Sequence, residues 1–188
     1  MLKNLKVEPY ESTGSSGKLV PGGYVCRIIG VREDGDRLVV AYDIEEGPFK
    51  GYFKARHDRD IQRDPGAKWK GTYTIWETDY NDKGKASAAL NGFAGALEHS
   101  NSGFSYDSAV ENFSLFKGRL IGLLMRDEEY NGYAYVKPYI AVGAGRVRNG
   151  EYTINQKKGT PHSDVNGFTD DQGFTPATKD EQDDGLPF

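Results

Sequence analysis

The sequence predicts a mainly β protein with an acidic C-terminal extension. Runs of β-branched and aromatic residues alternate with polar residues between turns rich in Gly, Asp and Asn, and only one segment has a clear helical period. The chain has 188 residues, which is enough for one core of ordinary domain size plus an extension.

The first two predicted strands form a hairpin. Residues 23–32 follow a Pro-Gly-Gly turn and are rich in β-branched and aromatic side chains. Residues 33–36 read EDGD, and Asp-Gly readily supplies the positive φ of a tight turn. Residues 37–44, RLVVAYDI, then pair back as the second strand.

A third strand is predicted over residues 68–79, where apolar and polar residues alternate clearly. The segment before it is ambiguous and is compatible with a short helix near residues 50–60, which the Asp-Pro-Gly at 64–66 would end. The main helix is predicted over residues 85–99, because apolar residues recur there at spacings of three and four.

The last two predicted strands, residues 117–127 and 133–143, are joined by Asn131-Gly132, a strong hairpin signal. Three strands, a helix and two strands is the order that an OB-fold five-stranded barrel needs, with the helix plugging one end between strands 3 and 4. We expect this domain over residues 1–150 and a disordered acidic tail over residues 151–188. Another barrel or an α+β sandwich is compatible with the same order.

Alternation within the strands separates a core face from an outer face. In the third strand Trp69, Tyr73 and Ile75 share one face, whereas Trp76 stands on the polar face. In the fifth strand one face carries Ala134, Val136, Ile140 and Val142, and the other carries Tyr133, Tyr135, Lys137 and Tyr139. Exposed rings beside lysines suit nucleobases, which stack on aromatic side chains while cations meet the phosphates.

We therefore predict nucleic-acid contacts by rings and cations on the outer faces and adjoining segments. Packing within the sheet is the alternative explanation for any single tyrosine. The predicted contact residues are Trp76, Tyr80, Lys70, Lys83, Lys85, Tyr133, Tyr135, Lys137, Arg56 and Arg59.

Catalytic and metal-binding motifs find little support in the sequence. The three histidines are scattered, and neither a phosphate-binding loop nor a nucleophile elbow occurs. Cys26 is the single cysteine, so no intrachain disulfide or Cys-rich zinc site is possible. No run of about 18 apolar residues is present. We expect a non-enzymatic cytoplasmic protein, without catalytic residues, metal, cofactor or membrane contact.

The formal net charge of −4 hides an asymmetry. Residues 161–188 hold seven acidic residues and one lysine, a charge of −6, whereas residues 1–160 hold 23 basic and 21 acidic residues, a charge of +2. A slightly basic body thus carries a strongly acidic tail, which ends on an apolar triplet rather than on the polar residues of a merely solubilising tail.

The terminus DDGLPF resembles the acidic tip of bacterial single-stranded DNA-binding proteins, which commonly read Asp-Asp-Asp-Ile-Pro-Phe. Asp183, Asp184, Pro187 and Phe188 match directly, Leu186 replaces isoleucine conservatively, and one acid is lost to glycine. The stretches YDIEEGPFKGYF and FKGRLIGLLMRDEEYNG resemble a divergent group of these proteins from phages and prophages of Gram-positive bacteria.

The resemblance implies a protein that coats single-stranded DNA with little sequence preference and recruits replication, recombination or repair proteins. The tip would dock through its terminal carboxylate and the Phe188 ring, and through Asp183 and Asp184. The acidic tail would compete with DNA for the basic groove. Three alternatives remain: an annealing or recombinase-loading accessory protein, an RNA binder, and a protein-interaction module without nucleic-acid binding. Homo-oligomers are possible.

Overall fold

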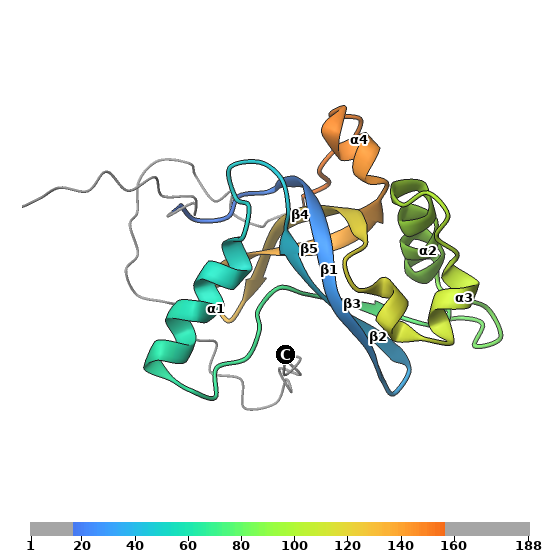
Figure 1. The fold of residues 1–188 in the computed structure, drawn as a ribbon, viewed down its shortest axis with the longest axis horizontal. Coiled ribbons are helices and arrows are strands. Elements are labelled where there is room, and N and C mark those ends of the chain that lie inside the picture. Colours follow the sequence, from blue (N-terminus) through green and yellow to red (C-terminus); the bar gives the residue numbers. More distant parts are fainter. Residues whose placement is uncertain (1–16, 157–188) are drawn as a thin grey trace, which may run out of the picture.

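The computed structural model describes residues 17–156, and the predicted tail beyond residue 156, including the tip, lies outside the described residues. Within this range five strands and four α-helices are arranged with the helices at both ends of one sheet (Figure 1). The elements are β1 (Gly22–Asp34), β2 (Arg37–Ile44), α1 (Tyr52–Arg63), β3 (Thr72–Trp76), α2 (Ala88–Ser100), α3 (Tyr106–Val110), a 3₁₀ turn η1 (Phe113–Phe116), β4 (Leu120–Tyr130), β5 (Tyr133–Val142) and α4 (Ala144–Arg148).

The five strands form one antiparallel sheet in the order β3-β2-β1-β4-β5. The two edge strands, β3 and β5, approach each other, but no hydrogen-bonded ladder joins them among residues 17–156, so the sheet is not closed. The prediction of a mainly β domain with a helix between the third and fourth strands is confirmed at this level.

Both predicted hairpin turns are present. Gly35 adopts a φ of 64° between β1 and β2. Asn131 and Gly132 adopt φ values of 51° and 81° between β4 and β5, the pair of left-handed residues that a type I′ turn requires. The turn residues therefore fix which strands pair with which neighbours.

β3 is shorter than the predicted strand over residues 68–79. The chain before it departs from the strand because the Trp69 indole turns inward, and its Nε1 donates to the backbone oxygens of Tyr42 and Gly71 at 3.1 and 3.2 Å. The chain after it enters a loop at Glu77. The predicted inward direction of Trp69, Tyr73 and Ile75 is confirmed, since their exposed fractions are 8%, 4% and 1%.

The predicted main helix begins later than expected, because Ser87 is its N-cap and accepts a hydrogen bond from Leu90 N at 2.9 Å. Phe93 and Leu97 are fully buried on the helix face that meets the sheet. The core lies between the concave face of the sheet, α1, α2 and η1. Its largest buried side chains include Tyr42, Phe93, Phe116, Ile28, Ile44, Ile75, Leu97, Ile121, Leu123 and Met125.

The predicted alternation along the fifth strand is wrong in its second half. The ladder with β4 shifts between Met125 paired with Pro138 and Leu124 paired with Ile140, so Tyr139 is an extra residue. This bulge reverses the faces that follow it. Ile140, expected on the core face with Val136, is 41% exposed, and Ala141 packs against the core instead.

The outer face of β1, β4 and β5 is covered by α4 and by the extended segment that follows it. The Tyr152 ring lies so close to Gly23 that a Cβ there would meet it at 2.6 Å, and a Cβ at Gly122 would meet Val147 at 2.7 Å. The Tyr139 hydroxyl accepts a hydrogen bond from Asn155 N at 2.9 Å. We call residues 151–156 the strap. The strap does not lie on the other half of the outer face, which β2 and β3 form.

Candidate nucleic-acid interface

The strand register aligns outward-pointing side chains in rows across β1, β2 and β3. At one end of the sheet Asp34, Arg37 and Trp76 lie opposite one another. The next outward rows hold Arg32, Val39 and Thr74, then Gly30, Ala41 and Thr72. Successive rows along this face follow the two-residue period of a strand.

Trp76 is the most prominent ring of these rows, with 56% of its surface exposed. The Arg37 guanidinium lies over it, 5.6 Å from the ring centroid. Arg37 is held in turn by the Asp34 carboxylate at 2.7 Å. The backbone oxygen of Trp76 accepts a hydrogen bond from the buried Ser87 hydroxyl at 2.5 Å, so the strand end is fixed against the start of α2.

The loop between β3 and α2, which follows Trp76 directly, carries three further predicted contact residues. Thr78 and Ala86 form a β-bridge at its base, and Asp79 N donates to Lys85 O at 2.8 Å. Tyr80 is 91% exposed beyond this closure, and Lys83 and Lys85 are exposed as well. Lys85 forms an ion pair with Asp82 at 3.2 Å. Four of the predicted contact residues, Trp76, Tyr80, Lys83 and Lys85, thus lie at the end of β3 and on the loop that follows it.

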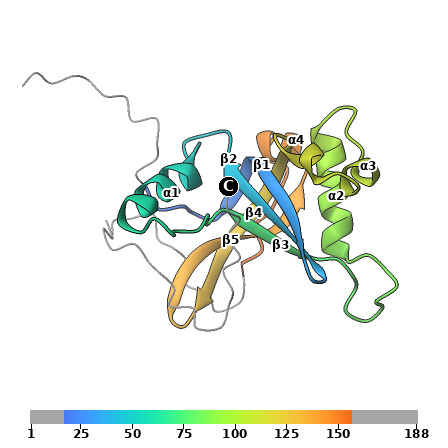
Figure 2. The ribbon, with the colours of Figure 1, turned by 60° about the horizontal axis from the view of Figure 1, so that its bottom comes forward.

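The predicted contact residues of β5, Tyr133, Tyr135 and Lys137, lie at a different end of the sheet from Trp76. The Trp76 row is opposite Asp34, the last residue of β1, whereas the β4–β5 hairpin extends past Gly22, the first residue of β1. Both views place the hairpin tip on the side of α1 and the end of β3 on the side of α2 and α3 (Figures 1 and 2). The structure therefore does not unite Trp76 with these side chains in one patch. Tyr133 is 58% exposed, Lys137 is exposed and Tyr135 is half-buried.

A hollow of about 460 Å³ lies between α1 and the outer face of β1 and β2; we call it the α1 hollow. Ile29, Ile44, His57 and Trp69 contribute its apolar and aromatic surface. The His57 and Trp69 rings lie 5.4 Å apart, centroid to centroid. Ile29 is the extra residue of a bulge in β1, where the register with β2 shifts between Ile28 and Gly30. Bulges are frequent beside functional sites because they re-aim side chains.

The rim of the α1 hollow carries both signs of charge. Arg27 and Lys50 form ion pairs with Glu45 at 2.9 and 3.3 Å, and Lys54 pairs with Asp58 at 2.6 Å. All three cations are at the surface, with side-chain exposures of 45%, 63% and 67%. Exposed pairs of this kind contribute about 0–1 kcal/mol each.

The third acid of the hollow, Asp43, caps α1. Its carboxylate accepts hydrogen bonds from the backbone N–H groups of Ile44, Phe53 and Lys54 at 2.8, 3.0 and 3.2 Å. This replaces a local cap, because the N-cap position is Gly51, in the left-handed region at φ 71°. Burial raises the pKa of the Asp43 carboxyl above its ordinary value, and the three N–H donors oppose that rise.

Arg56 and Arg59, predicted as contacts, are on α1 but do not line the hollow. Arg56 is half-buried and approaches Asp60 at 3.8 Å, and Arg59 is exposed. Lys70 is half-buried just before β3, next to Trp69. Of these three predicted cations, none lines the α1 hollow.

Sequence reasoning missed Arg27, Arg37 and Lys50. Arg37 had a readable signal, because it is the first residue after the Asp-Gly turn and faces the third strand. Arg27 and Lys50 had no readable signal, since they line the same hollow only because the chain after β2 folds back onto β1.

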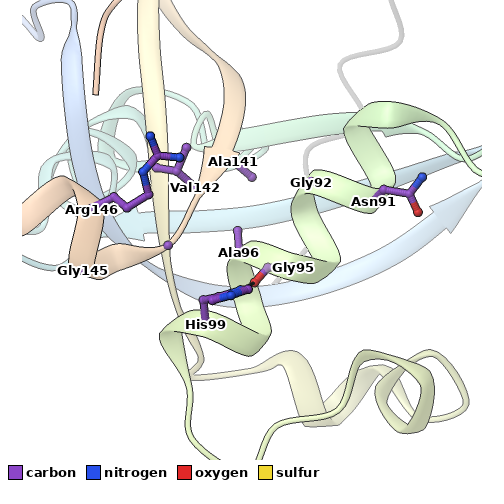
Figure 3. A pocket seen from close by; sticks show the side chains of 10 residues that line it. Asn91, Gly92, Gly95, Ala96, His99, Ala141, Val142, Gly145 and Arg146 are labelled. Atoms are coloured by element: carbon purple, nitrogen blue, oxygen red, sulfur yellow. Dashed lines mark hydrogen bonds between the residues drawn. The ribbon is translucent and has the colours of Figure 1, made fainter. Parts of the chain in front are cut away.

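A second hollow, of about 390 Å³, lies between α2 and the junction of β5 and α4 (Figure 3). Small residues of α2 form one side, and Figure 3 shows Ala96 and Gly95 between Asn91 and His99 at the two ends of the lined stretch. Arg146 lies across from them, and its Nε donates to Glu151 O at 3.2 Å. None of the predicted contact residues lines this hollow, and we assign it no ligand.

Comparisons with known proteins add no family to this picture. A scan against protein-family models and a search of curated proteins both found no match to this chain. Among residues 17–156 no helix is long and apolar enough to cross a membrane. The same part of the chain holds no cluster of three or more His, Cys, Asp or Glu side chains that would suit a metal ion.

Proposed function

We propose that this protein binds single-stranded DNA with little sequence preference and belongs with the phage- or prophage-type single-stranded DNA-binding proteins. The observation that carries the proposal is a cluster that we call the Trp76 corner. It consists of Trp76, Arg37 and the loop that carries Tyr80, Lys83 and Lys85. A large indole stands 56% exposed on the outer face of an edge strand, with one cation over its ring and an exposed tyrosine and two lysines on the adjoining loop.

The proposed fold is a partly open OB-type barrel. The strand order β3-β2-β1-β4-β5 supports it, because closing that sheet would bring β3 beside β5, and these are the edges that approach each other. The position of α2 between β3 and β4 supports it too. OB-folds bind oligonucleotides on the face of strands 2 and 3 and on the loops around it, which is where Trp76 lies.

The proposed mechanism is stacking plus phosphate contact. A base lies on the Trp76 ring, for about 1–3 kcal/mol per stacked base, and every base has a face that can do so. Arg37, which lies over the Trp76 ring, and Lys83 and Lys85 on the loop that follows β3 would meet the adjoining phosphates. The proposed role of the tip (Asp183, Asp184, Leu186, Pro187 and Phe188) is to recruit replication and recombination proteins.

Tryptophan fluorescence tests this proposal sharply, because the chain has two tryptophans and Trp69 is 8% exposed. Titration with oligo-dT should quench the wild-type emission, and Trp76→Phe should lose most of that quench. Trp76→Ala should weaken binding about 5- to 150-fold, which is the stacking energy above converted at 1.4 kcal/mol per tenfold.

Val110→Ala is a matched control, since Val110 is an exposed apolar residue on α3 with 40% of its surface accessible. It should leave the affinity unchanged. Absence of any binding at low salt, by the full chain and by a chain ending at residue 156, would refute the proposal. Full quenching in Trp76→Phe would refute the stacking mechanism.

A further inference from the structure

The Trp76 corner and the α1 hollow lie on the same outer face of β2. Arg37 pairs with Trp76 at one end, and six residues later Asp43 lies in the hollow. Six residues of strand span about 20 Å. Between these ends Val39 and Ala41 of β2 are buried, at 5% and 0% exposed, whereas Thr74 of β3 is exposed and Thr72 is half-buried. The open path between the two ends therefore follows the outer side of β3.

The α1 hollow has the chemistry of a nucleotide site. Its volume of about 460 Å³ is within the usual range of ligand pockets, about 300–1,000 Å³. Ile29 and His57 provide a surface for a flat base, whereas Trp69 is only 8% exposed, and Lys54 stands at the rim with 67% of its side chain exposed. The N-terminal N–H groups of α1 do not serve as the anion site, because Asp43 already accepts hydrogen bonds from Phe53 N and Lys54 N.

Lys54 is available to a phosphate because its present partner is weakly held. The ion pair with Asp58 is exposed on both sides, at 67% and 49%, so it contributes little to the stability of the helix. A phosphate that displaces the Asp58 carboxylate from Lys54 gains a cation but then faces a nearby anion. Asp58 should therefore oppose strand binding while Lys54 favours it.

We propose that the α1 hollow is a second nucleotide site for the same DNA strand, taking one base against Ile29 and His57 and its phosphate beside Lys54. This inference rests on the proposed function. It adds that the strand runs along β3 from Trp76 to α1, and that the α1 hollow binds the far end of a strand too long for the Trp76 corner alone.

The test compares short and long strands with three charge variants. Fluorescein-labelled oligo-dT of about 4 and about 16 nucleotides covers the range of OB-fold sites. Lys54→Gln should weaken binding of the long strand several-fold and lower its salt slope by about 0.7, the loss of one phosphate contact. Asp58→Asn should tighten binding of the long strand. Neither change should alter binding of the short strand, which is held at Trp76.

Arg63→Gln is the matched control, because it removes one positive charge from α1 on the opposite side. Arg63 lies nine residues after Lys54, which is half a turn out of phase on an α-helix. It should leave both strands unaffected. Equal effects of Lys54→Gln and Arg63→Gln, or equal effects on short and long strands, would mean that only the overall charge matters and would overturn the second site.

The base itself is located by photo-cross-linking of long strands that carry 5-iodouracil. Cross-links at His57 are expected, in addition to those at Trp76. Cross-links confined to Trp76 and its loop, in a protein that binds DNA, would overturn the second site and leave the proposed function intact. Absence of DNA binding in the wild type would overturn both.

Discussion

Gly71→Ala should strongly destabilise the protein, because Gly71 lies where α1, β2 and β3 meet. A Cβ added there would lie 2.3 Å from Tyr42 O, 2.8 Å from Phe53 Cγ and 2.9 Å from Trp69 Nε1. None of these atoms can move freely. Tyr42 O accepts a hydrogen bond from Trp69 Nε1, and Tyr42 N donates to Gly71 O at 2.8 Å.

The expected cost has two parts. Overpacking of a well-packed core costs about 1–3 kcal/mol, and a buried indole N–H that loses its acceptors costs about 1–3 kcal/mol more. The sum, roughly 2–6 kcal/mol, is a large share of the 5–15 kcal/mol by which ordinary domains are stable. Since the urea m-value of a small protein is about 1–3 kcal/mol/M, the unfolding midpoint should fall by about 1 M or more.

Urea unfolding followed by circular dichroism measures this shift, and Gly92→Ala provides a control of opposite sign. Gly92 is exposed within α2 and a Cβ there meets nothing within 4 Å, so alanine should stabilise the helix by about 0.5–1 kcal/mol. If Gly71→Ala unfolds at the same urea concentration as the wild type, the close approach of α1 to the sheet is wrong.

Two further predictions concern the interface and the core. Arg37→Ala should weaken oligo-dT binding and lower its salt slope by about 0.7. Arg37→Lys should restore the slope but not the full affinity, because an ammonium keeps the charge without the planar contact to Trp76. An unchanged affinity in both variants would contradict this role. Burial raises the pKa of Tyr24, Tyr73 and Tyr106 to about 12, so their contribution to stability is complete below pH 10 and is lost as pH rises from about 10 through about 12. Chemical denaturation at several alkaline pH values should show that fall, and constant stability across this window would contradict it.

The sequence by itself determined the strands, the turns and the main helix, because these depend on neighbours along the chain. Asn131-Gly132 specifies its hairpin through two residues that tolerate positive φ. The alternation around Tyr73 and Trp76 predicted which ring is buried and which is exposed, and the exposed fractions of 4% and 56% agree. A two-residue period needs no knowledge of the rest of the fold.

The extent and faces of the elements were less readable. The bulge at Tyr139 adds one residue to one strand only, so it reverses the outward direction at Ile140 without any signal in the alternation. The strap hydrogen-bonds to the Tyr139 hydroxyl, although residues 151–156 form neither helix nor strand. Both depend on partners distant in sequence.

Only the tertiary structure decided how the candidate contact residues are grouped. It keeps Trp76 with the loop that carries Tyr80, because Thr78 and Ala86 close that loop beside β3. It separates both from Tyr133, because the β1–β2 turn near Trp76 and the β4–β5 turn next to Tyr133 lie at opposite ends of β1. It also assembles the α1 hollow from segments before, within and after β2, and a site whose walls are far apart in the chain has no local pattern to reveal it.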